Sequence, residues 1–150
     1  GLWLRGEGDG LVPMAPARAG IVAFGDHKGT ACADVDGDGW SDVVFANNDG
    51  PLQTFAARVP GRALPLRVVL QGPKGNPTGV GAIVEAEREG GAIERRWVLA
   101  GSGYLSQDSA TVTFARGGGK VVAVRVRWPD GARSDVRERL DRPVVAVPHR

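Results

Sequence analysis

Short segments in which apolar and polar residues alternate, each ending near glycine or proline, restrict this fold more than any other feature. From residue 80 to residue 86 every second side chain is apolar, and residues 122–128 repeat this alternation. Charged side chains fill the opposite phase of both segments: Glu85, Glu87, Glu89, Arg125 and Arg127. Successive side chains of a strand point to opposite faces, so this period of two predicts strands with one buried face.

The remaining composition also favours strands joined by tight turns. The 150 residues include 23 glycines and 10 prolines, and signals for helices are nearly absent, with residues 134–140 as the one weak candidate. Apolar runs are far shorter than the roughly 20 residues that a membrane-spanning helix needs. We therefore expect an all-β chain with no transmembrane segment, in which residues 61–150 form an antiparallel β-sandwich of about seven strands.

Charge divides the chain into two parts. Residues 1–60 carry four Lys/Arg against eight Asp/Glu, whereas residues 61–150 carry fifteen against nine. The sign changes at Val59-Pro60-Gly61, where we place the boundary between two modules. Nucleic acid is not an expected partner, because basic residues alternate with acidic ones and no group of aromatic residues offers stacking faces.

The strongest chemical motif lies in residues 34–42, Asp-Val-Asp-Gly-Asp-Gly-Trp-Ser-Asp. Acids stand at loop positions 1, 3, 5 and 9, and Gly39 at position 6 permits a sharp turn. Four carboxylates this close repel one another without a cation, and Ca²⁺ takes six to eight oxygen ligands. The predicted ligands are four carboxylates and one main-chain carbonyl: Asp34, Asp36, Asp38, Asp42 and the carbonyl of Trp40.

This loop differs from an EF-hand, which needs a bidentate Glu at position 12 and a helix on each side. Position 12 is Phe45, and the flanking residues are typical of strands. The alternative interpretation is a solvated acidic turn without an ion. Asp26 and Asp49 are nearby acids, for which a role in turns is favoured over a role as ligands.

Two resemblances cover the chain. Residues 29–47, Gly-Thr-Ala-Cys-Ala followed by the acidic loop and Val-Val-Phe-Ala-Asn, resemble an FG-GAP/VCBS repeat, the calcium-binding blade unit of integrin-like β-propellers. Residues 75–82, 100–107 and 124–131 resemble, in order, three blocks of the ASPIC/UnbV domain. The resemblances imply a blade-like unit at residues 1–60, either a last propeller blade or a cap on the sandwich. They also imply an extracytoplasmic location and interaction or scaffold roles, without catalytic residues.

Groups for catalysis are scarce in the sequence. Cys32 is the single cysteine, and we expect it to be an inert thiol buried in an apolar strand. His27 stands beside Asp26, but no serine or thiol is placed to use it as a base. His149 is expected to fray near the chain end. We therefore expect no enzyme, no catalytic residues and no cofactor other than Ca²⁺.

The sequence favours a non-enzymatic, calcium-binding, extracytoplasmic module (periplasmic, secreted or at the cell surface) that docks on a protein partner. A larger membrane-associated assembly is one such partner. The alternative is a carbohydrate-binding module or an accessory domain of a secreted enzyme, which exposed Trp side chains on one sandwich face would support. No signal peptide opens the sequence, so we expect a processed chain or the C-terminal piece of a longer one.

Overall fold

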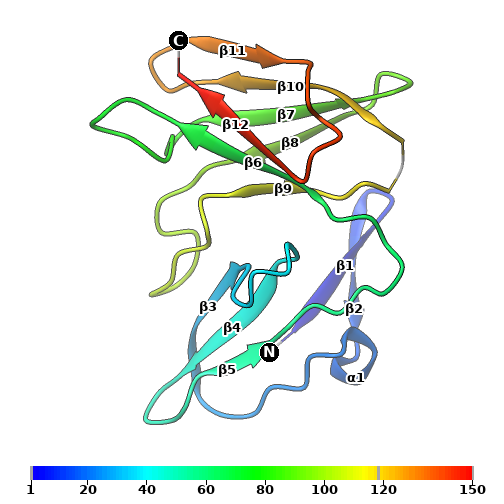
Figure 1. Ribbon diagram of the computed structural model, residues 1–150. Helices are drawn as coiled ribbons and strands as arrows, with labels where there is room; N and C mark the ends of the chain where they lie inside the picture. Colours follow the sequence, from blue (N-terminus) through cyan, green and yellow to red (C-terminus); the bar gives the residue numbers. More distant parts are fainter. Residues whose placement is uncertain (1, 118, 150) are drawn as a thin grey trace.

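The computed structural model describes residues 2–117 and 119–149. Strands dominate it, and the four-residue α1 (Pro16–Ala19) is the one α-helix within these ranges. Figure 1 shows two parts, with β1 to β5 in the lower half and β6 to β12 in the upper half. The expected all-β class is therefore confirmed.

The N-terminal part contains a hairpin and a separate antiparallel sheet of order β3-β4-β5. Their bounds are β1 Trp3–Glu7, β2 Gly10–Met14, β3 His27–Ala33, β4 Asp42–Asn47 and β5 Gln53–Phe55. The short helix α1 follows β2 directly, before the chain reaches β3. Most residues of β2 are exposed, so this strand lacks the apolar alternation that would have indicated it.

The C-terminal part has seven strands in its described residues, the number expected from the sequence. One sheet has the order β11-β10-β7-β8 and the other has the order β12-β6-β9. Their bounds are β6 Leu66–Gln71, β7 Ile83–Arg88, β8 Ile93–Trp97, β9 Val112–Phe114, β10 Val121–Arg127, β11 Arg133–Val136 and β12 Val144–Pro148. The candidate helix at residues 134–140 is absent, since β11 occupies its first residues and bends and a turn follow.

One pair of strands departs from the antiparallel arrangement. β12 pairs with β6 in parallel, with Val144 opposite Arg67 and Val147 opposite Leu70. The other edge of β6 pairs with β9 in the antiparallel sense. Alternation of side chains is the same in both directions, so the sequence pattern could not indicate this pairing.

The core lies between the two sheets of the sandwich. Leu66, Val68 and Leu70 are buried on one face of β6. In β10 the prediction is wrong at one position, because Val122 is only half-buried and Val121 and Ala123 are buried instead. A β-bulge at Val121–Ala123 shifts the pairing of β10 with β7 and moves these side chains by one position.

Arg88, which was not singled out from the sequence, is buried at the end of β7. Its guanidinium forms an ion pair with Glu94 and donates hydrogen bonds of 2.7 Å to the carbonyl oxygens of Gly119 and Ala115. A buried charge needs such partners, because burial without them is costly. Arg88 thereby ties β7 to the segment that joins β9 and β10.

The charged faces of the two alternating strands meet in one sheet. Arg125 lies opposite Glu85 in the register of β10 and β7, and it forms ion pairs with Glu87 and, at 3.4 Å, with Asp135. The hydrogen bond from Arg125 to Glu87 raises the pKa of this guanidinium. Arg125 is therefore paired with carboxylates on both neighbouring strands. Arg127 is exposed and lies opposite Arg133, with no ion pair in the described part of the chain.

Reversal of charge at Arg125 is expected to cause a small fall in the melting temperature. Arg125→Glu places a third carboxylate between Glu87 and Asp135, whereas Arg127→Glu removes a cation facing Arg133 and should be neutral or slightly stabilising. Thermal unfolding followed by circular dichroism at low and high salt measures both changes. A larger loss for Arg127→Glu than for Arg125→Glu would contradict this interpretation of the surface.

Candidate metal centre

The acidic loop connects β3 to β4, which lie side by side in the N-terminal sheet. Asp34 follows the last residue of β3, and Asp42 is the first residue of β4. Gly37 and Gly39 have φ of 77° and 93°, in the left-handed region that glycine adopts without strain. A Cβ on Gly39 would also lie 3.2 Å from Leu64 Cδ2, so the position has little room for a side chain.

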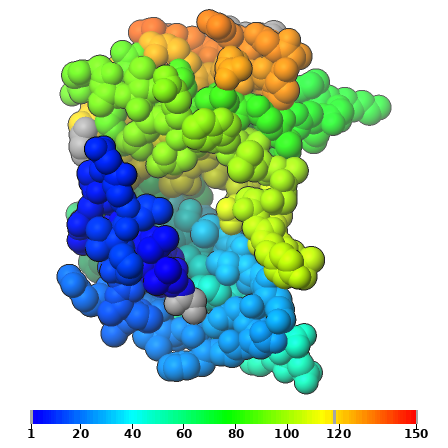
Figure 2. All heavy atoms as spheres, turned by 180° about the vertical axis from the view of Figure 1, so that it is seen from behind, coloured from blue at the N-terminus to red at the C-terminus, as the bar shows by residue number. Residues whose placement is uncertain are grey.

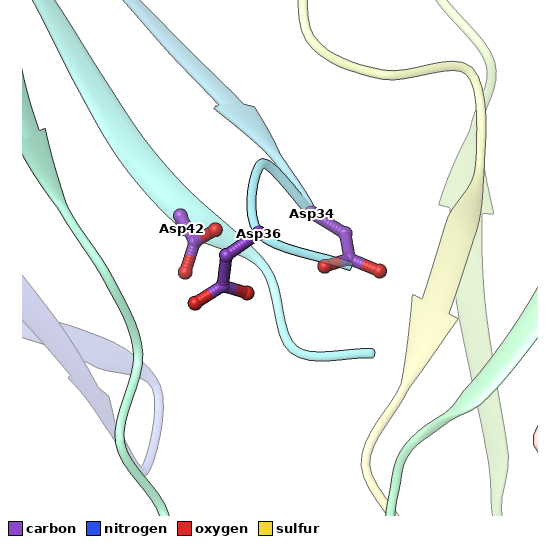
Figure 3. Close-up of side chains that lie close together, drawn as sticks. All are labelled: Asp34, Asp36 and Asp42. Atoms are coloured by element: carbon purple, nitrogen blue, oxygen red, sulfur yellow. The ribbon is translucent and has the colours of Figure 1, made fainter. Parts of the chain in front are cut away.

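Three side chains of the loop lie close together, as Figure 3 shows for Asp34, Asp36 and Asp42. Each offers one carboxylate oxygen, and these oxygens all lie within 4.8 Å of one another. Asp42 is buried, Asp34 is half-buried and Asp36 is exposed. The arrangement forms an acceptor-only set that can hold a cation at the edge of the sheet.

Main-chain hydrogen bonds hold two of these carboxylates in place. The two oxygens of Asp42 accept hydrogen bonds of 2.8 Å from the N–H groups of Val35 and Ala57. One oxygen of Asp34 accepts a hydrogen bond of 3.1 Å from Gly39 N–H. The other, Asp34 Oδ1, is buried and has no hydrogen-bond partner in the described residues. A buried carboxylate oxygen without a donor fits a bound cation.

Two arginines that sequence reasoning missed flank this cluster. Arg58 Nη1 lies 2.9 Å from Asp36 Oδ2 and 3.2 Å from Asp38 Oδ2, and Arg67 Nη1 lies 2.5 Å from Asp34 Oδ2. The hydrogen bond from Arg58 lowers the pKa of Asp36 and raises the pKa of Arg58 itself. Neither arginine is near the loop in sequence, so no local motif could have indicated this contact.

The structure brings together three of the five predicted ligands. Asp38 is outside the three-carboxylate cluster, and its Oδ1 accepts a hydrogen bond of 2.9 Å from Trp40 N–H. Asp26 forms an ion pair with Lys28 at 2.9 Å, and hydrogen bonding to Lys28 lowers the pKa of Asp26. Asp49 is exposed at a positive φ of 53° in the turn after β4. Both of these acids have the turn or surface roles that the sequence favoured.

Cys32 and the two histidines lie apart from this cluster. Cys32 is exposed on β3, so the expectation of a buried thiol is wrong. Partial desolvation and the nearby charge of Asp108 raise the pKa of Cys32, which disfavours the nucleophilic thiolate. His27 stacks on Phe45, with ring centroids 5.0 Å apart.

The expectation that His149 frays is also wrong. Its main-chain N–H donates a hydrogen bond of 2.9 Å to the carbonyl oxygen of Gln71. Its Nε2 lies 2.7 Å from Asp130 Oδ2, and its ring contacts the edge of Trp128 at a centroid distance of 4.9 Å. Parallel pairing of β12 with β6 brings His149 to these partners.

The fold and the carboxylate cluster define the class: a β-rich protein with a candidate metal centre of unassigned ion. Residues 72–140 match the family described as ASPIC and UnbV, so this stretch is an ASPIC/UnbV domain, as the three sequence blocks predicted. The match contains β7 to β11, whereas β6 and β12 lie just outside it. No FG-GAP/VCBS repeat is detected, and no curated protein matches the chain.

The described residues contain no helix with the length and apolar character required to cross a membrane.

Proposed function

We propose that this chain is a non-enzymatic, calcium-stabilised module that acts outside the cytoplasm and docks on a protein partner. A larger extracytoplasmic or membrane-associated assembly is the kind of partner proposed. The observation that carries the proposal is the close approach of one carboxylate oxygen each from Asp34, Asp36 and Asp42, all within 4.8 Å of one another, in the loop between β3 and β4.

The donor set supports Ca²⁺ as the ion. All of the converging groups are carboxylate oxygens, which a hard cation prefers, and Asp34 Oδ1 has no other partner. Asp38 and the carbonyl of Trp40 are the proposed additional ligands. Arg58 is exposed, so its guanidinium can leave Asp36 when an ion arrives. Mg²⁺ is a poorer candidate, because it gives up its water ligands reluctantly.

The proposed location outside the cytoplasm follows from the calcium affinity expected of such a loop. Extracellular calcium modules bind with Kd values of about 10⁻⁴–10⁻³ M, which requires a calcium-rich compartment. The FG-GAP/VCBS resemblance of residues 29–47 supports the same location and a role in binding proteins. The raised pKa of Cys32 also supports a role without covalent catalysis.

Asp36→Ala is expected to lower the melting temperature in calcium and to change it little in chelator. Asp36 is exposed and accepts its hydrogen bonds from Arg58 and Asp38, so the ion would be its main structural contribution. Differential scanning calorimetry in about 5 mM calcium, above the expected Kd, and in excess EGTA measures the two melting temperatures. They should differ for the wild-type chain because a bound ion stabilises the folded state by mass action.

The matched control is Asp141→Ala, which removes the same charge from an exposed position of the sandwich. It should leave the calcium-dependent rise in melting temperature unchanged. Equal effects of Asp36→Ala in calcium and in EGTA would show that the loop does not bind calcium.

Docking on a protein is tested by chemical cross-linking in a native extracytoplasmic extract, with the wild-type chain and Asp36→Ala compared in calcium and in EGTA. A cross-linked partner that depends on calcium and on Asp36 is the expected result. The absence of any calcium-dependent partner would contradict the proposed role in docking.

A further inference from the structure

One row of side chains crosses the outer face of the sheet β11-β10-β7-β8. Arg133 lies opposite Arg127, which lies opposite Ile83 on its other side. Ile83 in turn lies opposite Trp97. Opposed residues of neighbouring strands point to the same face, and the adjacent Val126 is buried, so the row faces away from the core. Figure 2 looks onto this side of the sandwich, with β11 in orange above the yellow-green β7 and β8. We call these four residues, Arg133, Arg127, Ile83 and Trp97, the arginine row.

Arg127 and Arg133 differ from the other arginines that these strands carry on this face. Those others have carboxylate partners, in the pairs Arg95–Glu85, Arg125–Glu87 and Arg125–Asp135. Arg127 and Arg133 are both exposed, and neither forms an ion pair or donates a side-chain hydrogen bond within residues 2–117 and 119–149. Asp130, in the turn between β10 and β11, lies 2.7 Å from His149 instead. The described residues therefore supply no counter-charge for this pair of arginines.

Arg127 and Arg133 face each other across two strands, where like charges destabilise the pairing. Cα atoms of opposed residues in antiparallel strands are about 4.5–5.5 Å apart, so both guanidinium groups can reach the same point above the sheet. Each guanidinium has five N–H donors, and a carboxylate can accept two of them in a bidentate contact. A carboxylate held between the two arginines would remove the repulsion and use donors of both. The geometry thus favours an anionic ligand.

The other end of the arginine row is apolar. Ile83 is half-buried, and Trp97 is 58% exposed at the end of β8. An exposed Trp alone is ordinary on a protein surface, but this one lies in register with the two arginines. Neighbouring strands are about 4.7–4.9 Å apart, so the Cα atoms of Trp97 and Arg127 are separated by about 10 Å. The row therefore fits a ligand that carries an apolar group roughly three extended residues away from its carboxylate.

The surroundings of the arginine row favour a protein segment over a membrane or a nucleic acid. Membranes and nucleic acids present many negative charges over a wide area, and several cations together hold them. On this face the carboxylates of Glu85, Glu87 and Asp135 lie around Arg125, so an extended anionic surface would meet repulsion. A short acidic segment that crosses the four strands along the arginine row avoids these carboxylates, because they lie in other rows.

We propose that the arginine row binds a short acidic segment of the partner protein, with a carboxylate held between Arg127 and Arg133 and an apolar side chain packed on Ile83 and Trp97. The inference rests on the proposed docking role and names the surface and the chemistry that the partner offers. Electrostatic attraction of this kind mainly speeds association and weakens as salt rises. The arginine row lies on the sandwich, so its binding does not require the ion of the acidic loop between β3 and β4.

The first test measures the fluorescence anisotropy of three short labelled peptides mixed with the wild-type chain at low and high salt. One peptide combines glutamate with leucine and phenylalanine, one combines glutamate with glycine, and one combines lysine with leucine and phenylalanine. The first peptide should bind best, and its affinity should fall as salt rises. Arg127→Glu should weaken this binding by about tenfold or more, the loss typical of a central interface contact. Trp97→Ala should weaken binding of the first peptide and leave that of the glutamate–glycine peptide unchanged.

Arg18→Glu is the matched control, since it makes the same change of charge at an exposed arginine of α1. Its affinity for the first peptide should equal that of the wild-type chain. Arg127→Glu is expected to fold at least as stably as the wild-type chain, so unfolding would not explain a loss of binding in that variant. Circular dichroism of both variants checks the fold. Arg133→Glu should weaken binding as Arg127→Glu does.

Equal losses for Arg127→Glu and Arg18→Glu, a preference for the lysine peptide, or no binding of any peptide would overturn the proposal. So would tighter binding of phosphatidylglycerol vesicles or of single-stranded DNA than of any peptide. Analytical ultracentrifugation tests a second copy of this chain as the occupant. A dimer that Arg127→Glu dissociates would assign the arginine row to self-association and would also overturn the proposal.

The cross-linking experiment separates this inference from the proposed function. A calcium-dependent cross-linked partner that persists in Arg127→Glu would leave the docking role intact and would overturn the role of the arginine row. Peptide binding that needs Arg127, without any calcium-dependent partner in the extract, would support the arginine row and contradict only the calcium dependence of docking.

Discussion

Asp42→Ala is expected to destabilise the N-terminal sheet by about 2–3 kcal/mol in EGTA, because it removes the acceptor of two part-buried main-chain N–H groups, and by more in calcium, because it also removes a proposed ligand. The donors belong to Val35 in the loop after β3 and to Ala57 after β5. The Asp42 side chain on β4 therefore links these two segments. This differs from Asp36→Ala, whose effect is expected only in calcium. Hydrogen exchange of the amides in β3 to β5 measures the loss where it occurs.

The matched control for this prediction is Asp42→Asn. The amide keeps one oxygen acceptor and the side-chain volume, so it should retain part of the stability in EGTA while weakening calcium binding. If Asp42→Ala changed hydrogen exchange in EGTA no more than Asp36→Ala does, the structural role of the buried carboxylate would be wrong.

Trp128→Ala is expected to destabilise the sandwich by about 3–5 kcal/mol, the range typical of truncating a large buried aromatic residue. Its indole N–H donates a hydrogen bond of 3.0 Å to Ser134 Oγ, which in turn donates one of 2.8 Å to the carbonyl oxygen of Pro148. A Cβ on Gly79 would lie 3.1 Å from Trp128 Cζ3, so the loop before β7 also packs closely on this ring. Urea unfolding followed by circular dichroism measures the loss.

Trp97→Ala provides the comparison, since it truncates the same residue type at an exposed site. It should alter the urea midpoint little, whereas Trp128→Ala should shift it strongly or abolish the folded state. Trp128→Phe should cost less than Trp128→Ala, because the ring volume is largely kept while the hydrogen bond to Ser134 is lost. Similar losses for Trp97→Ala and Trp128→Ala would contradict the assignment of Trp128 to the core.

The acidic loop could be predicted in part from sequence because its ligands are close together along the chain. The backbone of one tight turn determines how the acids and Gly39 are spaced. This spacing in the sequence therefore identified Asp34, Asp36 and Asp42 as neighbours. The contact of Arg67 with Asp34 depends on how the two parts of the chain meet, and no local pattern encodes it. Asp38 differs for a local reason, since its carboxylate accepts the N–H of Trp40.

For the strands too, features set by the local sequence could be predicted, whereas features set by distant contacts could not. Alternation indicated β7 and β10 because each has one face in the core. It missed β2, which has no buried face, and the bulge in β10, which arises from pairing with β7. Arg88 was missed for a related reason: it occupies a core-facing position, and only its distant partners make a charge acceptable there.

The parallel pairing of β6 with β12 has a consequence for the order in which the chain folds. β6 is the first strand of the sandwich, and it is hydrogen-bonded to β9 on one edge and to β12 on the other. Both neighbours are far downstream, and contacts between distant segments slow folding. During synthesis β6 therefore lacks one of its two neighbouring strands until β12 has left the ribosome. Over that interval its unpaired edges are open to aggregation or to a chaperone, so the sandwich should complete its fold only after translation of β12.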